Sequence, residues 1–343
     1  MIFCTIFDSF YLDKGLALYR SLVRVSDSFK LYIYAFDDKV YNVLLCMELK
    51  RVILLRNKDL ESAYPVLNEL KKERSKAEYC WTCTPVSVEY ILDHYKEEAC
   101  TYIDSDLYFF ADPQILFNEI REAGANIVIT PHRFSNSLKG KRMQKRSGKY
   151  CVEFNYFDQS DNSRSALCWW KERCFEWCYH IYENDRMGDQ KYLEKFPLFF
   201  KGVHELENLG GGVAPWNLSQ YKYAEGNSVS LKLRELSTEK KFEIIFFHFQ
   251  SMRYINENFI IIRSGTHSKK TKAAIYEPYL RELEKIRAEL DTRYGITFNA
   301  IQAYASNPII AFLQKYILRF KVKSLSDIYD LRKLRESNAE KVK

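Results

Sequence analysis

The chain has 343 residues, of which 47% are apolar and 28% are charged, so it can form one large α/β domain with an extension or two modest domains. This composition excludes a disordered or fibrous protein. The net charge is +7; residues 301–343 hold nine Lys and Arg against four Asp and Glu, which is +5. Nucleic-acid binders more often carry charge as a stripe over the folded domain, so we expect no nucleic-acid partner.

Short apolar segments alternate with helical patterns along the first part of the chain. The expected elements are a strand at Ile2–Phe7, a helix at Lys14–Val25, a strand at Leu31–Phe36, a helix at Val40–Leu49 and a strand at Arg51–Leu55. Strand–helix–strand order at this spacing is typical of a parallel sheet with crossover helices.

The later elements are spaced more widely. We expect a helix over residues 75–95 that breaks near Pro85, strands at Cys100–Asp104 and Asn126–Thr130, a helix at Ser165–Glu183, a flexible loop at Leu209–Val213, and strands at Glu243–His248 and Ile260–Arg263. Beyond about Ser264 the pattern is basic and helical, without clear strands. The expected organisation is an α/β domain over residues 1–263 and a basic helical C-terminal extension over residues 264–343.

Two acidic residues mark the end of one expected strand. Asp104 and Asp106 lie between the apolar segments Thr101–Ile103 and Leu107–Phe110. Residues two apart in an extended chain point to the same side, and α/β sheets bind ligands at the carboxyl ends of strands. Two adjacent carboxylates repel each other unless a hard divalent cation binds them. A capped loop start is the alternative interpretation, but the apolar flanks favour a metal site.

His248 is a third potential ligand because it ends the expected strand Glu243–His248. A lone histidine at a strand end is usually structural. With Asp104 and Asp106, however, it would complete a metal site. Two carboxylates and one imidazole suit Mn²⁺, and Mg²⁺ less well. We therefore expect these three side chains to converge on one cation.

Two further patterns allow more than one interpretation. Asp189 and Gln190 follow Gly188 and either orient a sugar through its hydroxyls or cap a helix over Lys191–Phe196. The glycine run Gly210–Gly212 lacks the Lys-Ser/Thr of a phosphate-binding loop, so it indicates a hinge or a close approach of backbone.

Nine cysteines are scattered without a framework spacing, which is typical of reduced cytosolic thiols. The pairs Cys80/Cys83 and Cys174/Cys178 lack the accompanying Cys/His cluster of a zinc site, and we interpret them as free thiols.

In these residues the chain resembles the GT-A glycosyltransferases, in particular the bacterial family 8-like enzymes of surface-polysaccharide assembly. The matching pieces, in family order, are the first strand and loop Phe3–Tyr11, the segment Glu78–Pro85, the metal motif Tyr102–Asp106, the donor-sugar motif Gly188–Gln190 and the histidine motif at His248-Phe249. Ordered matches over residues 1–262 are far more specific than any one of them.

The resemblance implies a GT-A fold, which is a mixed, mostly parallel sheet flanked by helices, and a retaining transfer from a UDP-sugar to a glycan or lipid-linked acceptor with Mn²⁺ or Mg²⁺ as cofactor. The implied donor-binding residues are Thr5, Phe7, Asp8, Tyr11, Tyr79, Thr82, Asp104, Ser105 and Arg253. The implied catalytic residues beside the anomeric carbon are Asp189 and Gln190; the implied metal ligands are Asp104, Asp106 and His248. If the enzyme were inverting, Asp189 would be the first candidate for the base.

The sequence departs from the family in the histidine motif. In the family this motif continues to a glycine and a phosphate-binding lysine, whereas Gln250–Arg253 follow here. Arg253 stands in for the lysine with an offset of one residue. An Asn-Ser-Gly stretch ahead of the donor motif is not evident near Cys151–Tyr156. These departures indicate a divergent bacterial subgroup.

Two other functions remain open. A nucleotidyltransferase also uses acidic metal sites on an α/β sheet, but it usually has a basic, glycine-rich loop after the first strand, which Asp8–Tyr11 is not. The other is a non-catalytic glycan-binding protein on the same fold, and the presence of all three metal ligands argues against it.

We expect a cytoplasmic protein, because Met1–Phe7 is too short and lacks the basic leader of a secretory signal and no segment has the ~18 uninterrupted apolar residues of a spanning helix. In a helix starting at Ile309, large apolar residues fall on one face, interspersed with four Lys and Arg. We therefore expect the extension to contact the anionic inner face of the cytoplasmic membrane. Packing of that face on the catalytic domain or on a second subunit is the alternative.

Overall fold

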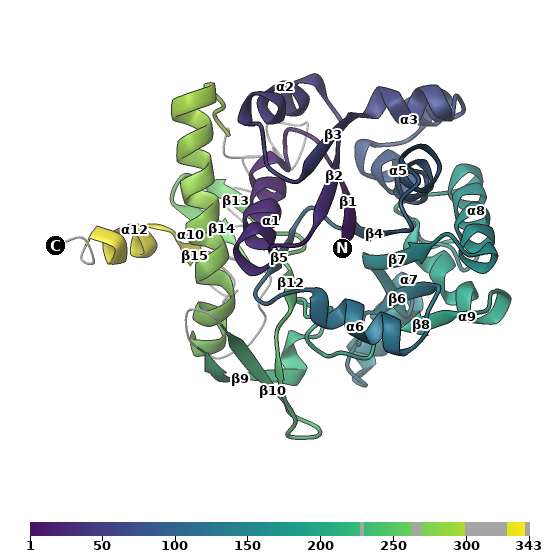
Figure 1. Cartoon of the computed structure of the whole chain (residues 1–343). Helices are drawn as coiled ribbons and strands as arrows, with labels where there is room; N and C mark the ends of the chain where they lie inside the picture. Colours follow the sequence, from purple (N-terminus) through teal and green to yellow (C-terminus); the bar gives the residue numbers. More distant parts are fainter. Residues whose placement is uncertain (227–229, 263–268, 299–327, 340–343) are drawn as a thin grey trace.

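A seven-stranded mixed sheet forms the centre of the molecule (Figure 1). The computed structural model describes residues 1–226, 230–262, 269–298 and 328–339. In sheet order the strands are β3 (Val52–Arg56), β2 (Lys30–Ala35), β1 (Ile2–Phe7), β4 (Ala99–Ile103), β7 (Tyr150–Asp158), β6 (Ile127–Pro131) and β8 (Val203–Glu205). Strand β7 runs antiparallel to β4 and β6, and the other pairs are parallel. The expected mixed, mostly parallel sheet is confirmed.

Helices cover both faces of this sheet, each over its own buried apolar cluster. One face carries α1 (Leu12–Val25), α2 (Asp38–Met47), α6 (Gln114–Glu122) and α10 (Lys269–Tyr294). The other carries α3 (Asn57–Ala63), α4 (Leu67–Glu73), α5 (Lys76–Tyr90) and α8 (Asp161–Glu176). The shorter elements are α7 (Leu138–Ser147), α9 (Phe196–Phe199), α12 (Arg332–Ala339), a π-helical turn at Ile91–Tyr95, and 3₁₀ turns at Gln190–Lys195 and Leu218–Gln220.

Three small antiparallel sheets surround the central one. They are formed by β5 (Leu107–Phe109) with β12 (Phe246–His248); by β9 (Tyr221–Gly226), β10 (Leu231–Glu235) and β11 (Lys241–Glu243); and by β13 (Arg253–Asn256), β14 (Phe259–Ile261) and β15 (Ile328–Asp330). The pair β5–β12 matters most for function, because it joins the end of β4 to a segment about 140 residues farther along the chain.

Two predicted helix boundaries are wrong. Helix α5 continues through Pro85 instead of breaking there. Its start is fixed by a capping box between Ser75 and Glu78, and burial of the segment Thr82–Glu89 stabilises the helix despite the missing proline N–H. Helix α8 ends at Glu176, seven residues early, because Trp177 takes an extended conformation.

The described part of the C-terminal extension packs on the rest of the chain. Helix α10 lies against α1 (Figure 1), and its Tyr279 ring stacks on Phe249 with centroids 3.8 Å apart. Strand β15 pairs with β14, so the expectation of no strand beyond Ser264 is wrong. The predicted amphipathic helix from Ile309 lies outside the described residues. The division of the chain into two domains at residue 263 stays a prediction.

Among the helices of the described residues, none is both long and apolar enough to cross a membrane. All nine cysteines are free thiols, as the sequence predicts.

The packing of α10 predicts the effect of one core substitution. Leu283 is fully buried in the cluster shared with α1, so Leu283→Ala should lower the free energy of unfolding by about 2–5 kcal/mol through the cavity it leaves. Urea unfolding measures this. The exposed Arg293 of the same helix is the control, and Arg293→Ala should change stability by less than about 0.5 kcal/mol. Equal stability of both variants would show that α10 is not part of the core.

Candidate metal and donor site

The segment Asp104–Asp106 connects the central sheet to the small sheet β5–β12. The backbone N–H of Asp104 still donates to the carbonyl of Glu153 on β7 (3.2 Å), and the N–H of Leu107 donates to the carbonyl of Asp104 (3.2 Å). This turn carries both carboxylates at the carboxyl end of β4, where ligands bind in α/β sheets.

Pairing of β12 with β5 sets the position of His248. The register places His248 opposite Leu107, and the N–H of Phe249 donates to the carbonyl of Asp106 at 2.9 Å. The Nε2 atom of His248 consequently lies 3.0 Å from Asp106 Oδ1 and 3.6 Å from Asp104 Oδ2. The sequence singled out these three residues, and the structure places both carboxylates beside the imidazole of His248.

These distances fit one hard divalent cation. Metal–oxygen bonds of about 2.1 Å in octahedral geometry place neighbouring donor atoms roughly 3 Å apart, close to the 3.0 Å and 3.6 Å that separate His248 Nε2 from Asp106 and Asp104. Two carboxylates and an imidazole are also a donor set suited to Mn²⁺. Asp104, Asp106 and His248 could therefore hold such an ion with small side-chain movements.

Glu153 supports His248 from behind and is a residue that the sequence analysis missed. Its side chain is fully buried, and its Oε2 lies 2.7 Å from Nδ1 of His248. With Nδ1–H donated to this carboxylate, Nε2 is left to face Asp104 and Asp106. Carboxylates that orient a ligating histidine in this way also raise its basicity. The available signal was a lone charged residue within the apolar segment Tyr150–Phe157.

Burial and neighbouring charges shift the pKa values of His248, Asp104 and Asp189. Burial itself lowers the pKa of His248, but the charge and hydrogen bond of Asp106 outweigh it, and the pKa lies well above its usual range. Burial raises the pKa of Asp104 to about 7, against the opposing charge of His248. Burial, with the nearby charge of Asp104, raises the pKa of Asp189 to about 8. Protons thus offset part of the buried charge that a divalent cation would compensate.

Cys151 also lies next to His248 and Asp104. Burial raises the pKa of its thiol to about 12, so the sulfur stays protonated near neutral pH. A neutral thiol is a poor ligand for a hard cation. Asp106 is therefore a better candidate ligand than Cys151, although it is the Cys151 sulfur that lies within 4.8 Å of both His248 and Asp104.

The glycine run makes the close backbone approach expected from the sequence. Gly212 has φ +97°, and a Cβ atom there would lie 3.0 Å from Glu153 Oε1 and 2.9 Å from Thr130 Cγ2. The next residue, Val213, accepts the N–H of His248 at 3.0 Å. Glycine at position 212 therefore lets the loop reach β12 without displacing Glu153.

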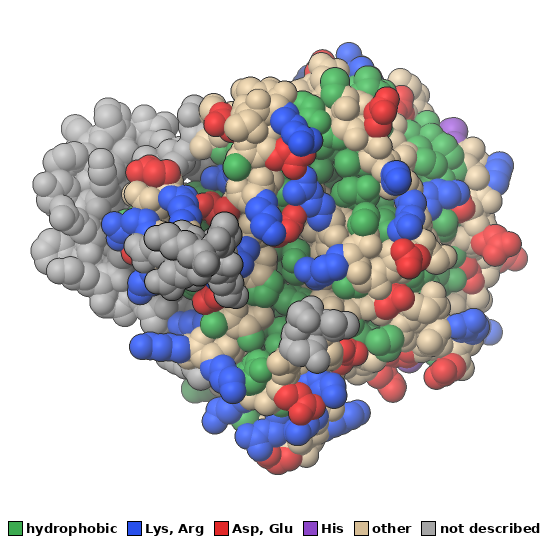
Figure 2. Space-filling view, turned by 60° about the vertical axis from the view of Figure 1, so that its left-hand side comes forward, with side chains coloured by type: hydrophobic (Ala, Val, Ile, Leu, Met, Phe, Trp, Pro, Cys, Tyr) green, Lys and Arg blue, Asp and Glu red, His purple; other side chains and the backbone are tan. Residues whose placement is uncertain are grey.

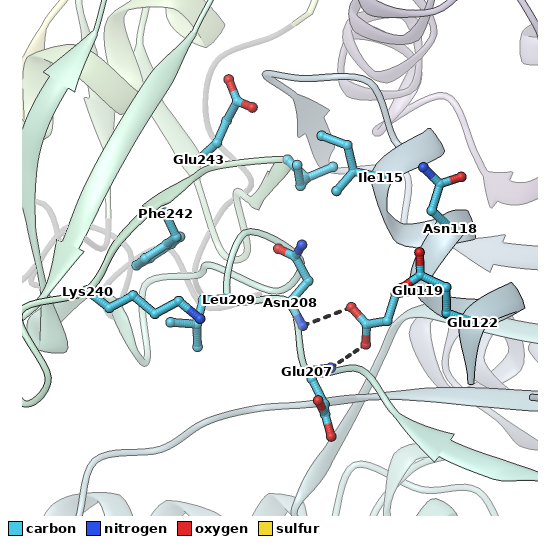
Figure 3. Close-up of a pocket in the computed structure, with 11 residues that line it drawn as sticks. Ile115, Asn118, Glu119, Glu122, Glu207, Asn208, Leu209, Lys240, Phe242 and Glu243 are labelled. Carbon is cyan, nitrogen blue, oxygen red and sulfur yellow. Dashed lines mark hydrogen bonds between the residues drawn. The ribbon is translucent and has the colours of Figure 1, made fainter.

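A pocket of about 590 Å³ borders the start of this loop, between α6, the loop and β11 (Figure 3). Within it, Glu119 accepts the backbone N–H groups of Glu207 (2.6 Å) and Asn208 (3.0 Å), as the dashed lines in Figure 3 show. Glu119 thereby anchors the loop that leads to Gly212. None of the candidate site residues lines this pocket.

The first turn of α1 brings a second residue that the sequence did not predict, Lys14, to the site. Lys14 is 9% exposed, and its ammonium lies 3.8 Å from the centre of the Tyr11 ring and 3.5 Å from the carbonyl of Met252. Burial lowers its pKa, and the charge of Asp106 acts in the opposite direction. Arg253 also influences Lys14 and Tyr11 electrostatically. Two cations thus lie beside the candidate metal site.

The structure places several expected donor residues elsewhere. Tyr79 donates its hydroxyl to Glu61 (3.0 Å), and the buried Thr82 hydroxyl donates to the carbonyl of Glu78 (2.7 Å). Their neighbours on α5, Cys80 and Thr84, influence the site instead: the Thr84 hydroxyl opposes the rise in the pKa of Asp189, and the charges of Asp104, Asp189 and Asp8 raise the pKa of the Cys80 thiol. The face of α5 that meets the site is therefore the one with Cys80 and Thr84, not the one with Tyr79 and Thr82.

Four other residues that were expected to bind the donor lie on or near β1 and in the turn after β4. The Phe7 ring is 3% exposed in the core beneath Gly15, so it is not available to stack on a base. Thr5 is fully buried on β1, with its hydroxyl unpartnered. Asp8 accepts the N–H of Phe10 at 3.0 Å, and Ser105 is buried in the turn.

The two catalytic candidates point in different directions. The buried carboxyl of Asp189 lies near Asp104, whereas the Gln190 amide donates to the carbonyl of Ser147 at 2.8 Å.

Glu153→Gln tests the support of His248. Gln cannot accept Nδ1–H as strongly as a carboxylate, so we expect Mn²⁺ affinity to fall by about 10–100-fold, measured by calorimetry. Cys151→Ala is the matched control on the same strand and should leave the affinity within about threefold of the unmodified chain. A large loss in Cys151→Ala, with none in Glu153→Gln, would reverse the two assignments.

Two proteins of Bacillus subtilis (strain 168) are similar to the chain in sequence, and both are described as uncharacterized. YfnF is 29% identical over 261 residues, which cover 75% of this chain and 83% of YfnF. YfnD is 28% identical over 297 residues, which cover 85% of this chain and 91% of YfnD. No protein-family model matches the chain.

Among solved structures, the galactosyltransferase LgtC in complex with donor and acceptor sugar analogs superposes with a TM-score of 0.51 at 12% identity. The match covers 83% of this chain and 96% of LgtC. At this identity the likeness concerns the fold. Together with the central sheet and its flanking helices, it shows that the chain has the GT-A glycosyltransferase fold.

Proposed function

We propose that the chain is a metal-dependent glycosyltransferase that moves a sugar from a UDP-sugar to a glycan or lipid-linked acceptor in bacterial surface-polysaccharide assembly, with retention of configuration. The observation that carries this proposal is that His248 Nε2 lies within 3.6 Å of the carboxylates of both Asp104 and Asp106 at the carboxyl end of β4. On a GT-A fold this is the place where a nucleotide-sugar and its cation would meet.

Different charged side chains would bind different parts of the donor. Asp104, Asp106 and His248 would hold the cation, which supplies Lewis-acid stabilisation of the charge that develops on the leaving diphosphate. Lys14 and Arg253 would pair with the phosphate oxygens by charge-assisted hydrogen bonds. Tyr11, whose face already carries the Lys14 ammonium, would border the base and ribose together with Asp8.

Asp189 and Gln190 would lie beside the sugar. One N–H of the Gln190 amide donates to Ser147, so its second N–H and its carbonyl oxygen would be left for hydroxyls of the sugar. In a retaining reaction Asp189 would orient the sugar. In an inverting one it would act as the base, and its pKa of about 8 suits proton abstraction near neutral pH. The anomeric configuration of the product, read by NMR, distinguishes the two roles.

The proposal also covers location. The enzyme would work in the cytoplasm, with residues 301–343 contacting the anionic inner face of the cytoplasmic membrane. Vesicle co-sedimentation of the full chain and of a chain ending at residue 300 tests this contact.

Donor turnover separates this function from its alternatives. With Mn²⁺ present, the chain should release UDP from a UDP-sugar, and Asp106→Asn should reduce that release by roughly three decades. Asp291→Asn, an exposed acid-to-amide change on α10, is the matched control and should keep full activity. Pyrophosphate-dependent formation of a nucleotide-sugar would identify a nucleotidyltransferase. Glycan binding without UDP release would identify a binding protein.

Lys14 provides a test of diphosphate recognition. Lys14→Met keeps the side-chain volume but removes the charge, so the affinity for UDP should fall roughly 10- to 100-fold, while the affinity for uridine, which lacks phosphates, should not change. Calorimetry with both ligands measures this, and the exposed Lys39→Met is the control. Equal losses for UDP and uridine would place Lys14 outside the phosphate contact.

A further inference from the structure

Helix α7 carries the least compensated positive charge in the described part of the chain. Its ten residues, Leu138–Ser147, contain five Lys and Arg and no acid. All five side chains are exposed, and none forms an ion pair or hydrogen bond with any residue that the structure describes. The five are Lys139, Lys141, Arg142, Lys145 and Arg146.

Helix geometry gathers these cations on one side. At about 100° per residue, they and Leu138 occupy one continuous arc of roughly 160° around the helix axis. In order around this arc lie Lys141, Lys145, Leu138, Arg142, Arg146 and Lys139. The opposite side faces the protein: Gly140 is buried, and Met143 and Ser147 are half-buried. The whole outward face is therefore cationic, with one apolar side chain at its centre.

Leu138 is the most exposed large apolar side chain of the described residues, with 86% of its surface exposed. A leucine surrounded by cations gains nothing from this position in water. In the head-group region of an anionic bilayer, by contrast, the leucine can insert while the cations meet phosphates.

A second basic region, near β9 and β10, differs from α7 because its cations have acidic partners. In Figure 2, Lys and Arg gather at the lower end of the molecule, where the β9–β10 hairpin lies in Figure 1, with acidic side chains among them. There Lys232 lies 3.1 Å from Glu225, and Arg234 pairs with Glu239. These cations are compensated within the protein, and those of α7 are not.

The convex shape of the α7 face favours a partner that is itself an extended charged surface. Cations that diverge over a convex arc cannot converge on one phosphate, as a built phosphate site requires. A plane of anionic head groups can engage all five at once. We propose that α7 docks the protein on an anionic phospholipid bilayer through its cations and Leu138. This inference does not depend on the proposed function.

Helix α7 and the loop before it are connected to the candidate site by hydrogen bonds and a ring contact. The carbonyl of Ser147, the last residue of α7, accepts the Gln190 amide. The loop before α7 is tied to the site as well, because Trp216 Nε1 donates to the carbonyl of His132 at 2.8 Å and the Trp216 ring packs on His248. A bilayer held by α7 would therefore lie beside the candidate site.

Co-sedimentation of the full chain with vesicles tests this docking. Vesicles of phosphatidylcholine with 30% phosphatidylglycerol should bind the chain at low salt, and pure phosphatidylcholine vesicles should not. Each cation near an anionic surface contributes roughly a fivefold gain in binding. The triple variant K139Q/R142Q/R146Q should therefore bind about a hundredfold more weakly, and Leu138→Ser roughly tenfold more weakly.

The control removes the same charge elsewhere. K39Q/K58Q/K201Q alters three exposed lysines outside α7 and should bind within about threefold of the unmodified chain. Because every variant keeps residues 301–343, a contribution from that segment is constant across the set. Circular dichroism verifies that each variant is folded.

Three results would overturn the proposal. They are no binding of the unmodified chain to anionic vesicles, equal binding of the α7 and control variants, and binding of soluble polyphosphate without vesicle binding. Release of UDP by the α7 variant reports on the proposed function separately, so failure of one proposal leaves the other to be judged on its own.

Discussion

Four ionisable side chains that lie together set the constraint on which the rest of the site depends. The buried Asp106 and Glu153 and the half-buried Asp104 bring three acidic groups against the single buried imidazole of His248. Unbalanced buried charge costs several kcal/mol, and because the pKa values of His248 and Asp104 are raised, bound protons offset part of it. A divalent cation would balance the same charge without protons, which is why we propose a metal at this position.

The surrounding strands bring these groups together from distant parts of the chain. The turn after β4 carries the two aspartates, β7 carries Glu153, and β12 carries His248, which is positioned by the pairing of β12 with β5. The loop ending at Gly212 can pass this close only without a side chain. Behind β12, Tyr279 of α10 stacks on Phe249, so the C-terminal elements also support the position of the histidine.

Local patterns in the sequence were enough for the first four strands of the central sheet and for placing Asp104, Asp106 and His248 at strand ends. The alternation of apolar strands and helices predicted β1 to β4 to within a few residues, whereas β7 was not predicted. Residues that act through a long-range contact were not predicted. Glu153 contacts His248 only because β7 lies beside β12, and Lys14 reaches the Asp104–Asp106 turn only because α1 packs next to it. Tyr79 and Thr82 were chosen over Cys80 and Thr84 because sequence spacing alone does not show which face of α5 meets the sheet.

Pulsed electron paramagnetic resonance of Mn²⁺ bound to the chain with UDP tests the central claim most directly, because it reports on the atoms around the ion. The account predicts hyperfine coupling to one imidazole nitrogen, absent in His248→Gln, together with coupling to phosphorus of the diphosphate. Bound Mn²⁺ that shows phosphorus coupling but no nitrogen coupling would contradict the assignment of His248, and an ion with neither coupling would contradict the site as a whole.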